Sequence, residues 1–282
     1  MAIGSPLVQV LARWRILFPC QQAFMRHSPT PRFIMNESIN PYAPPTSVTL
    51  SVGREMPGNG EIMSRAWQLY RRHFGIIAVT ICVIWVPCEV LSSYMDAFVF
   101  GEDDFRRSFK LVQFLENFFG IIATAGVIHL ALHDGTGGVT SALSCGLKRW
   151  PSMWWARFAS TMACLLAFVL LVVPFFYLYP RLMLVESALV SEGLTGMQAI
   201  NRSQQLVRGH YWQVVRLLLW LALLLAIPII LVIVLSTFEV LPDHWQLDAV
   251  TSVIVDLASG YGTVCLFCLY QALASYEVTK TA

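Results

Sequence analysis

The sequence predicts an all-α integral membrane protein, a helical bundle of about six transmembrane helices arranged as three hairpins. The first observation is composition: 56% of the 282 residues are hydrophobic and only 13% are charged, whereas about a quarter of a soluble domain is charged. The second is a set of apolar runs as long as a membrane-spanning helix, about 20 residues. The third is an internal repeat, which places a short basic segment before each hairpin. We therefore expect a multi-pass protein of the cell membrane, the inner membrane in a bacterium.

Five apolar runs are long enough to cross a bilayer as helices. They are residues 74–95, 111–133, 154–173, 211–236 and 249–272. A sixth run, residues 175–190, is shorter and contains a proline and two charged residues. Its composition alone leaves open whether it crosses.

Residues 1–60 are expected to form a disordered amino-terminal tail. The part after Met35 is rich in Pro, Ser and Gly and has too few apolar residues for a core. The first 34 residues contain four arginines and no acid. Either translation begins at Met35 and these residues are a mis-assigned extension, or they form a targeting segment. The helical transmembrane domain is expected over 61–276, followed by a short carboxyl-terminal tail over 277–282.

The basic segments are related to one another. NRSQQLVRGHY at 201–211 repeats SRAWQLYRRHF at 64–74 with five identities. The identical pairs are Arg65 and Arg202, Gln68 and Gln205, Leu69 and Leu206, Arg71 and Arg208, and His73 and His210. A fainter third copy, SALSCGLKRWPSMW at 141–154, retains a leucine and Arg149. The chain is therefore predicted to consist of three units, each an amphipathic interfacial helix followed by an apolar hairpin: 61–133, 139–190 and 196–272.

The repeat also predicts a topology. If the basic helices lie on one side of the membrane, the number of crossings between them is even, and 175–190 must return across the bilayer, fully or partly. Lys and Arg near span ends mark the cytoplasmic side. The basic segments then lie in the cytoplasm, and the connection 237–248, which has three acids and no Lys or Arg, lies outside. Both chain ends are expected to be cytoplasmic.

Each basic helix is predicted to have an apolar stripe and a charged face. The stripes are Met197, Ile200, Val207 and Tyr211 in one copy, and Ile62, Ala66, Leu69 and His73 in another. Such a helix lies in the membrane interface, with its apolar side on lipid and its arginines toward anionic headgroups. The candidate residues for binding lipid or a membrane-protein partner are Arg65, Arg71, Arg149, Arg202 and Arg208. Alternatively, these helices only anchor the spans that follow them.

One segment resembles a known family. Residues 181–215, RLMLVESALVSEGLTGMQAINRSQQLVRGHYWQVV, are similar to the signature of the glycerophosphoryl diester phosphodiesterase membrane-domain family and of related six-span bacterial membrane proteins. The matching positions are Arg181, Glu192, Gly193, Ala199, Ser203, Leu206, Gly209, and Tyr211 or Trp212. The resemblance implies a helical membrane module of undefined biochemical role. It does not imply the phosphodiesterase activity, because this sequence holds no segment of the length of the soluble catalytic barrel.

Charged residues within or near the predicted hydrocarbon suggest a different class of function. They are Glu89, Arg181, Glu186 and Asp256. Ionisable groups at that depth usually face the bundle interior and pair, because an unpaired charge there costs several kcal/mol. One hypothesis is therefore a small transporter or proton-coupled carrier in which Arg181 neutralises Asp256 or Glu89. Alternatively, the two glutamates simply reach the interface.

A third hypothesis is a metal-dependent intramembrane enzyme. His129 and His133 are one helical turn apart beside Asp134, a spacing that suits zinc. The sequence nearby shows no third ligand, and histidines at an interface need no metal. Cys265 and Cys268 share a helix face but lack a second ligand pair.

The sequence contains no Ser–His–Asp set, phosphate-binding glycine loop or dinucleotide fingerprint. Its net charge of +2 gives no reason to expect a nucleic-acid partner. We therefore expect a non-enzymatic module without catalytic residues or cofactor, whose partners are membrane lipids or a membrane protein.

Overall fold

A computed structural model of the chain describes residues 56–95, 98–99, 105–170, 172–237 and 245–281. The regular structure within these ranges is entirely helical, which confirms the all-α part of the predicted fold class. Three described helices are long and apolar enough to cross a membrane, over residues 74–95, 138–169 and 252–278. A fourth span is added if α8 (Gly196–Arg208) and the helix after it, which meet at 102°, form one broken span. The amino-terminal tail up to residue 55, with both interpretations of it, lies outside the described residues.

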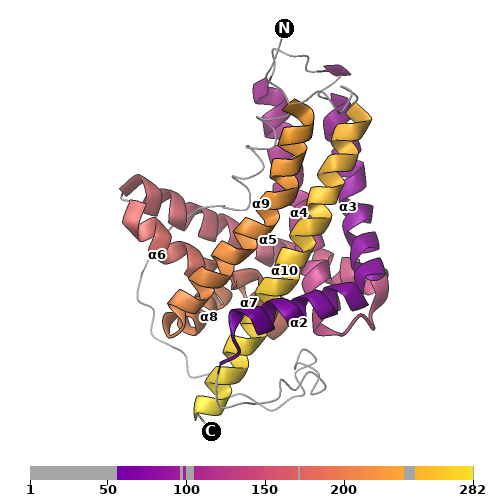
Figure 1. Cartoon of the computed structure of the whole chain (residues 1–282). Coiled ribbons are helices and arrows are strands. Elements are labelled where there is room, and N and C mark those ends of the chain that lie inside the picture. Colours follow the sequence, from indigo (N-terminus) through magenta and orange to yellow (C-terminus); the bar gives the residue numbers. More distant parts are fainter. Residues whose placement is uncertain (1–55, 96–97, 100–104, 171, 238–244, 282) are drawn as a thin grey trace.

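Four long helices lie side by side (Figure 1): α3 (Phe74–Met95), α4 (Phe105–Leu132), α9 (Tyr211–Thr237) and α10 (Trp245–Thr281). Helix α3 has the same bounds as the first predicted run. The outer face of α3 is apolar, with exposed Val79, Val83, Val86 and Val90. These residues recur every three or four positions and so share one face of the helix. Because soluble proteins rarely expose so continuous an apolar stripe, this face suits lipid.

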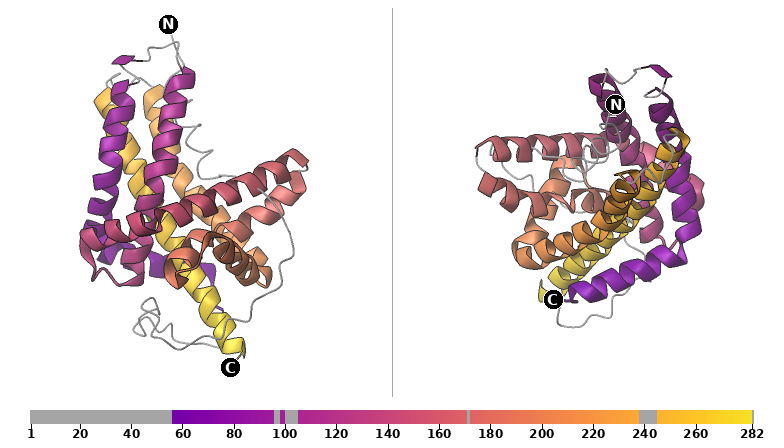
Figure 2. Two further views of the ribbon diagram at one scale, coloured as in Figure 1. Left: turned by 180° about the vertical axis from the view of Figure 1, so that it is seen from behind. Right: turned by 45° about the horizontal axis from the view of Figure 1, so that its top comes forward.

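The middle hairpin is arranged differently. Helices α5 (Gly138–Leu170) and α6 (Val172–Leu182) project from the side of the four long helices (Figures 1 and 2). Helix α6 has only 11 residues, or about 16 Å of helix, against a hydrocarbon core of about 30 Å. The sixth apolar run is divided between α6 and a separate helix, α7 (Val185–Glu192), which is buried in protein.

Two of the three basic segments form helices of their own. They are α2 (Asn59–Arg72) and α8, and both lie at the end of the molecule where α10 ends (Figure 1). The third segment, 141–154, does not, because it forms the first half of α5. Pro151 stands where the first copy has His73. A proline removes one helical N–H donor and crowds the preceding turn, but α5 continues through it. The neighbouring indole of Trp150 donates a hydrogen bond to the carbonyl oxygen of Phe118 at 2.9 Å, which holds α5 on α4.

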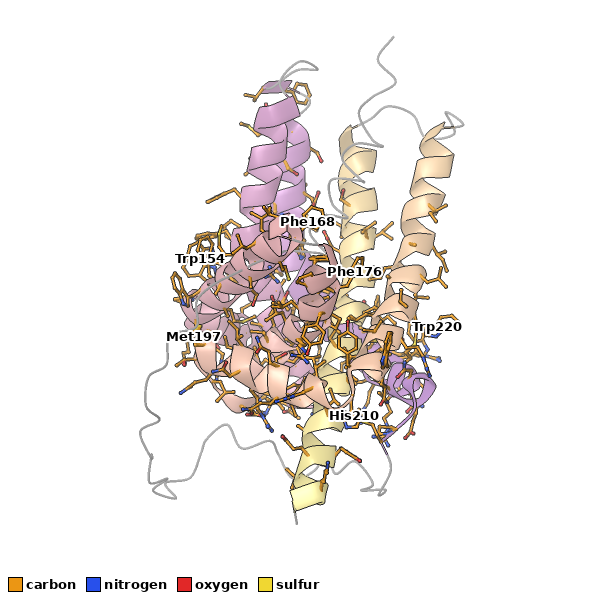
Figure 3. All side chains as sticks on the ribbon, turned by 90° about the vertical axis from the view of Figure 1, so that its left-hand side faces the viewer. Trp154, Phe168, Phe176, Met197, His210 and Trp220 are labelled. Atoms are coloured by element: carbon orange, nitrogen blue, oxygen red, sulfur yellow. The ribbon has the colours of Figure 1, made fainter. Side chains whose placement is uncertain are left out.

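Protein, rather than lipid, covers the apolar faces of the two basic helices. Helix α2 packs on α10, where the Tyr70 hydroxyl donates to the Leu257 carbonyl oxygen at 2.8 Å and the Tyr261 hydroxyl to that of Met63 at 3.2 Å. Helix α8 buries Ala199, Ser203, Leu206 and Val207. Met197, which was predicted for the apolar stripe, is 51% exposed at the outer edge of the molecule (Figure 3). For α2 the prediction that lipid covers the apolar stripe is therefore wrong, because helical periodicity identifies an apolar face but not what packs against it. In α8 the face that protein buries includes only Val207 of the predicted stripe.

Both ends of the helical domain extend beyond the predicted bounds. Helix α2 begins at Asn59, whose side chain donates to the carbonyl oxygen of Gln213 at 3.2 Å. The Gln213 side chain in turn donates to the Pro57 carbonyl oxygen at 2.7 Å. Helix α10 continues to Thr281, so most of the predicted tail 277–282 is helical.

Helices α4 and α5 approach each other closely at Gly146, where an added Cβ would lie 2.7 Å from the carbonyl oxygen of Ile122. Small residues permit such contacts between membrane helices. We expect Gly146→Ala to destabilise the protein by about 1–3 kcal/mol, because the helices must separate. Gly75→Ala is the control, since no atom lies within 4 Å of its added Cβ. The measurement is thermal unfolding in detergent, and equal stability of the two variants would contradict the close approach.

Candidate functional site

The repeated sequence reappears as two similar bends, which we call the first elbow (residues 71–74) and the second elbow (residues 208–212). At each elbow a basic helix ends and an apolar helix begins. The first bend follows from the backbone of His73, which has φ −110° and ψ 18°. The second contains Gly209, and glycine is a poor helix former. Each elbow also carries an exposed aromatic residue, Phe74 (47%) or Trp212 (76%), of the kind that anchors helices at a membrane surface.

The repeated arginines divide into an engaged and an exposed set. Arg65 and Arg202 are equivalent in the repeat, and both form ion pairs. Arg71 and Arg208 are also equivalent, and both are exposed. Neither of the latter has an ion-pair partner within the part of the chain that the structure describes. The copies at 64–74 and 201–211 thus each offer one arginine that is held by protein and one that is available to a ligand. Arg149, at the position of Arg71 and Arg208 in the third copy, is held by protein.

Arg202 lies in an ion network that joins three helices. Its Nε lies 3.0 Å from Glu192 Oε1 on α7, and its Nη1 pairs with Glu277 on α10. The Tyr270 hydroxyl donates to the same Glu192 oxygen. Burial alone would lower the pKa of Arg202, but the hydrogen bonds and charges of the two glutamates outweigh burial and raise that pKa. The sequence predicted that Arg202 binds lipid, but in the structure its guanidinium pairs with the carboxylates of Glu192 and Glu277.

Two further candidate arginines also have protein partners. Arg65 Nη2 lies 3.1 Å from Glu61 Oε1, one turn earlier on α2. Arg149 donates to the carbonyl oxygen of Leu189 at 2.8 Å and so ties α5 to α7. Of the five arginines predicted from the sequence, only the exposed set remains free of protein partners among the described residues.

The histidines of the two elbows have different neighbours. His73 Nε2 lies 2.8 Å from Asp134 Oδ1 in the turn between α4 and α5. Arg72 reaches the other oxygen of that carboxylate at 3.2 Å. At the second elbow the His210 ring meets the Tyr276 ring edge-on, with 4.9 Å between centroids. Burial and then the charge of Lys280 lower the pKa of His210. Sequence reasoning missed Asp134 as the partner of His73, because the two residues are far apart in sequence.

Arg181 does not meet the acids predicted as its partners. It lies in the last turn of α6, on the projecting hairpin, while Glu89 and Asp256 are on α3 and α10. Its guanidinium carbon lies 3.8 Å from the centroid of the Tyr177 ring, and its Nη2 donates to the Tyr177 hydroxyl. The predicted neutralisation of Arg181 by Asp256 or Glu89 is therefore not formed. Glu89 itself is 4% exposed.

Glu186 is paired, but with a residue that the sequence did not single out. Arg157 Nη2 on α5 lies 2.6 Å from Glu186 Oε1 on α7, and Arg157 Nε donates to the same oxygen at 2.8 Å. Both side chains are less than a third exposed. The pair ties the middle hairpin to α7, so Glu186 does not simply reach the interface.

The two histidines of the metal hypothesis are adjacent, with 4.5 Å between the ring centroids of His129 and His133. His129 Nε2 is hydrogen-bonded to Ser141 Oγ at 2.9 Å. Across the described ranges, no group of three or more His, Cys, Asp or Glu residues is placed to hold a metal ion. The geometry therefore gives the predicted zinc enzyme no ligand set.

The residues that carry the family resemblance have structural roles. Gly193 ends α7 with φ +68°, a left-handed conformation that glycine adopts without strain. Ala199 and Ser203 are fully buried. The Ser203 hydroxyl donates to the carbonyl oxygen of Arg181 at 2.5 Å and so joins α8 to α6. The pattern thus describes how α6, α7 and α8 pack.

Comparisons with known proteins identify no family. No protein-family model matches the chain, and no curated protein or solved structure matches it significantly. The resemblance of residues 181–215 to the phosphodiesterase membrane-domain family accordingly stays a prediction.

The two engaged arginines should differ in their contribution to stability. Arg202→Gln is expected to lower the free energy of unfolding by about 1–3 kcal/mol, because it removes the cation that two partly buried carboxylates share. Arg65→Gln is the matched control and should cost less than about 1 kcal/mol, since it breaks an exposed pair within one helix. Thermal unfolding in detergent compares the two variants. Equal loss would show that the Arg202 network does not hold the three helices together.

Proposed function

We propose that this chain is a non-enzymatic membrane module that binds anionic lipids at the cytoplasmic surface through Arg71 and Arg208. The observation that carries the proposal is the division of the repeated arginines. Equivalent positions in two copies remain exposed and without an ion pair in the described residues, while the other repeated arginines are engaged by protein. A pair of cations at the start of two apolar helices suits the negatively charged headgroup layer.

The elbows also carry exposed aromatic residues and a fixed backbone, both of which favour binding at the headgroup layer. Exposed Phe74 and Trp212 lie next to the two arginines in sequence, and amphipathic aromatic rings favour the headgroup level. The first elbow is fixed by the contact between His73 and Asp134. A rigid elbow loses little conformational entropy when an arginine binds a phosphate, and this favours binding.

For the topology we propose six membrane segments, the fourth of which crosses only partly, with both termini in the cytoplasm. The placement of α2 and α8 at one end of the molecule supports this arrangement (Figure 1). So does the path of α5 and α6, which leave the bundle and return to α7 and α8. In this topology the middle hairpin enters the membrane at an angle and the short α6 crosses it only partly.

Lipid binding can be tested by comparing Arg71 with Arg65, which carries the same charge on the same helix. We expect Arg71→Gln to weaken binding of phosphatidylglycerol about fivefold and the double change with Arg208→Gln about thirtyfold, since each arginine near an anionic surface contributes about 1 kcal/mol. Arg65→Gln is the control, because Arg65 is already paired with Glu61. Quenching of tryptophan fluorescence by brominated phosphatidylglycerol in detergent measures the affinity. A double variant that binds as tightly as the unmodified protein contradicts the proposed function.

Topology can be tested at the repeat itself. Gln68 and Gln205 are equivalent and exposed, so each can be replaced by cysteine in a chain whose native cysteines are alanine. Both should react with a membrane-impermeant maleimide only after the cells are permeabilised. Labelling of one position from outside and of the other from inside would overturn the even number of crossings between the two copies.

A further inference from the structure

A cation without a counterion lies at the end of α6. The Arg181 guanidinium is stacked over the Tyr177 ring one turn earlier. Its Nε is buried and has no hydrogen-bond partner. It forms no ion pair with any residue that the structure describes. Because a guanidinium stays charged at any physiological pH, and a partly desolvated charge is stable only when it is compensated, this position calls for an anion.

The hydrogen-bonding geometry at this cation suits a phosphate. Arg181 Nη2 donates to the Tyr177 hydroxyl oxygen in a contact that is exposed at the surface. Since that oxygen acts as the acceptor, the hydroxyl proton is free to point outward to a ligand. The Nη groups and the hydroxyl can both donate to a ligand at this exposed contact, whereas the buried Nε cannot. Arginine binds phosphate oxygens well because its planar fork matches their spacing.

Three contacts from other helices hold this pair in place. The Ser203 hydroxyl on α8 donates to the carbonyl oxygen of Arg181 at 2.5 Å. The Tyr211 hydroxyl, at the start of α9, donates to the carbonyl oxygen of Phe176 at 2.7 Å. The ring of Tyr211 also lies beside that of Tyr177, with 5.8 Å between centroids. A site whose donors are positioned before binding loses less entropy on binding.

The hairpin that carries the cation exposes aromatic side chains. Phe176 is 63% and Tyr177 51% exposed on α6, and Phe168 is 55% exposed on the neighbouring α5. Figure 3 shows Phe168 and Phe176 together on the projecting hairpin. An inorganic anion gains nothing from such a surface, whereas an acyl chain gains about 25 cal/mol for each Å² of apolar area that it covers. The neighbourhood therefore favours a ligand with a phosphate and a hydrocarbon chain.

We propose that Arg181 and Tyr177 form a binding site for the phosphate of one anionic phospholipid, whose acyl chains lie against the aromatic surface of the α5–α6 hairpin. The site rests on the proposed function in its choice of a membrane lipid as ligand. It differs from the elbows because it combines a stacked guanidinium, a hydroxyl donor and an apolar surface. It should therefore retain a single lipid, while the elbows interact with the headgroup layer.

The test counts the phosphatidylglycerol molecules that stay on the purified full-length protein, by native mass spectrometry in a neutral detergent. We expect one tightly retained molecule, with no comparable retention of phosphatidylcholine. Arg181→Met should weaken retention at least tenfold, because it removes charge-assisted hydrogen bonds. Tyr177→Phe keeps the ring and the stacking surface and should weaken retention about three- to tenfold through loss of one hydroxyl donor. Arg216→Met removes the same charge as a control, since Arg216 is exposed and lies outside this site.

Each other outcome has a defined meaning. If Tyr177→Phe and Arg181→Met retain phosphatidylglycerol as the unmodified protein does, Arg181 only compensates the end of the α6 dipole and the site is overturned. If millimolar inorganic phosphate displaces the lipid, the phosphate of a soluble molecule is the ligand, and the lipid assignment is wrong. Tyr177→Phe decides the question should Arg181→Met fail to fold. Retention that survives the double change at Arg71 and Arg208 separates this site from the elbows, so that either proposal can fail alone.

Discussion

The ion network around Arg202 is the interaction on which the placement of the repeated segment at 201–211 depends. One guanidinium receives carboxylates from α7 and α10 while it belongs to α8. Removing it would leave two negative charges facing each other in a partly buried position, which is costly. Helix α8 is therefore held against α7 and α10, and α9 leaves it at 102° after Gly209. The second elbow and its exposed Arg208 result from this constraint.

The two copies of the repeat reach similar bends through different contacts. In the first copy Arg65 pairs within its own helix, and the elbow is held by Asp134 from the turn after α4. In the second copy Arg202 takes partners from two other helices. The available arginine is nevertheless at the same position in both copies. The contacts differ between the two copies, but the exposed arginine is common to both. The proposed lipid binding is therefore assigned to the exposed arginines and not to the engaged ones.

The sequence predicted what depends on local composition and periodicity. It predicted helical structure throughout the described residues, the bounds of α3, and the division between α2 and α3. It could not predict contacts between distant positions, such as Arg202 with Glu277 or His73 with Asp134, because a charge pattern does not say which charges meet. The third basic segment was misjudged for a related reason. Trp150 packs on α4 and keeps that segment within a single long helix.

The position of Arg181 at the end of a short helix avoids the energetic cost that a charge has in the middle of a membrane-spanning helix. An arginine in the middle of a membrane-spanning helix costs several kcal/mol unless it is paired or near water. Helix α6 is only 11 residues long, and Arg181 lies in its last turn. The Ser203 contact places that turn against α8, at the end of the molecule where the elbows lie. With the elbows at the headgroup layer, the guanidinium lies at the same boundary, where its charge is compatible with the membrane and within reach of lipid phosphates.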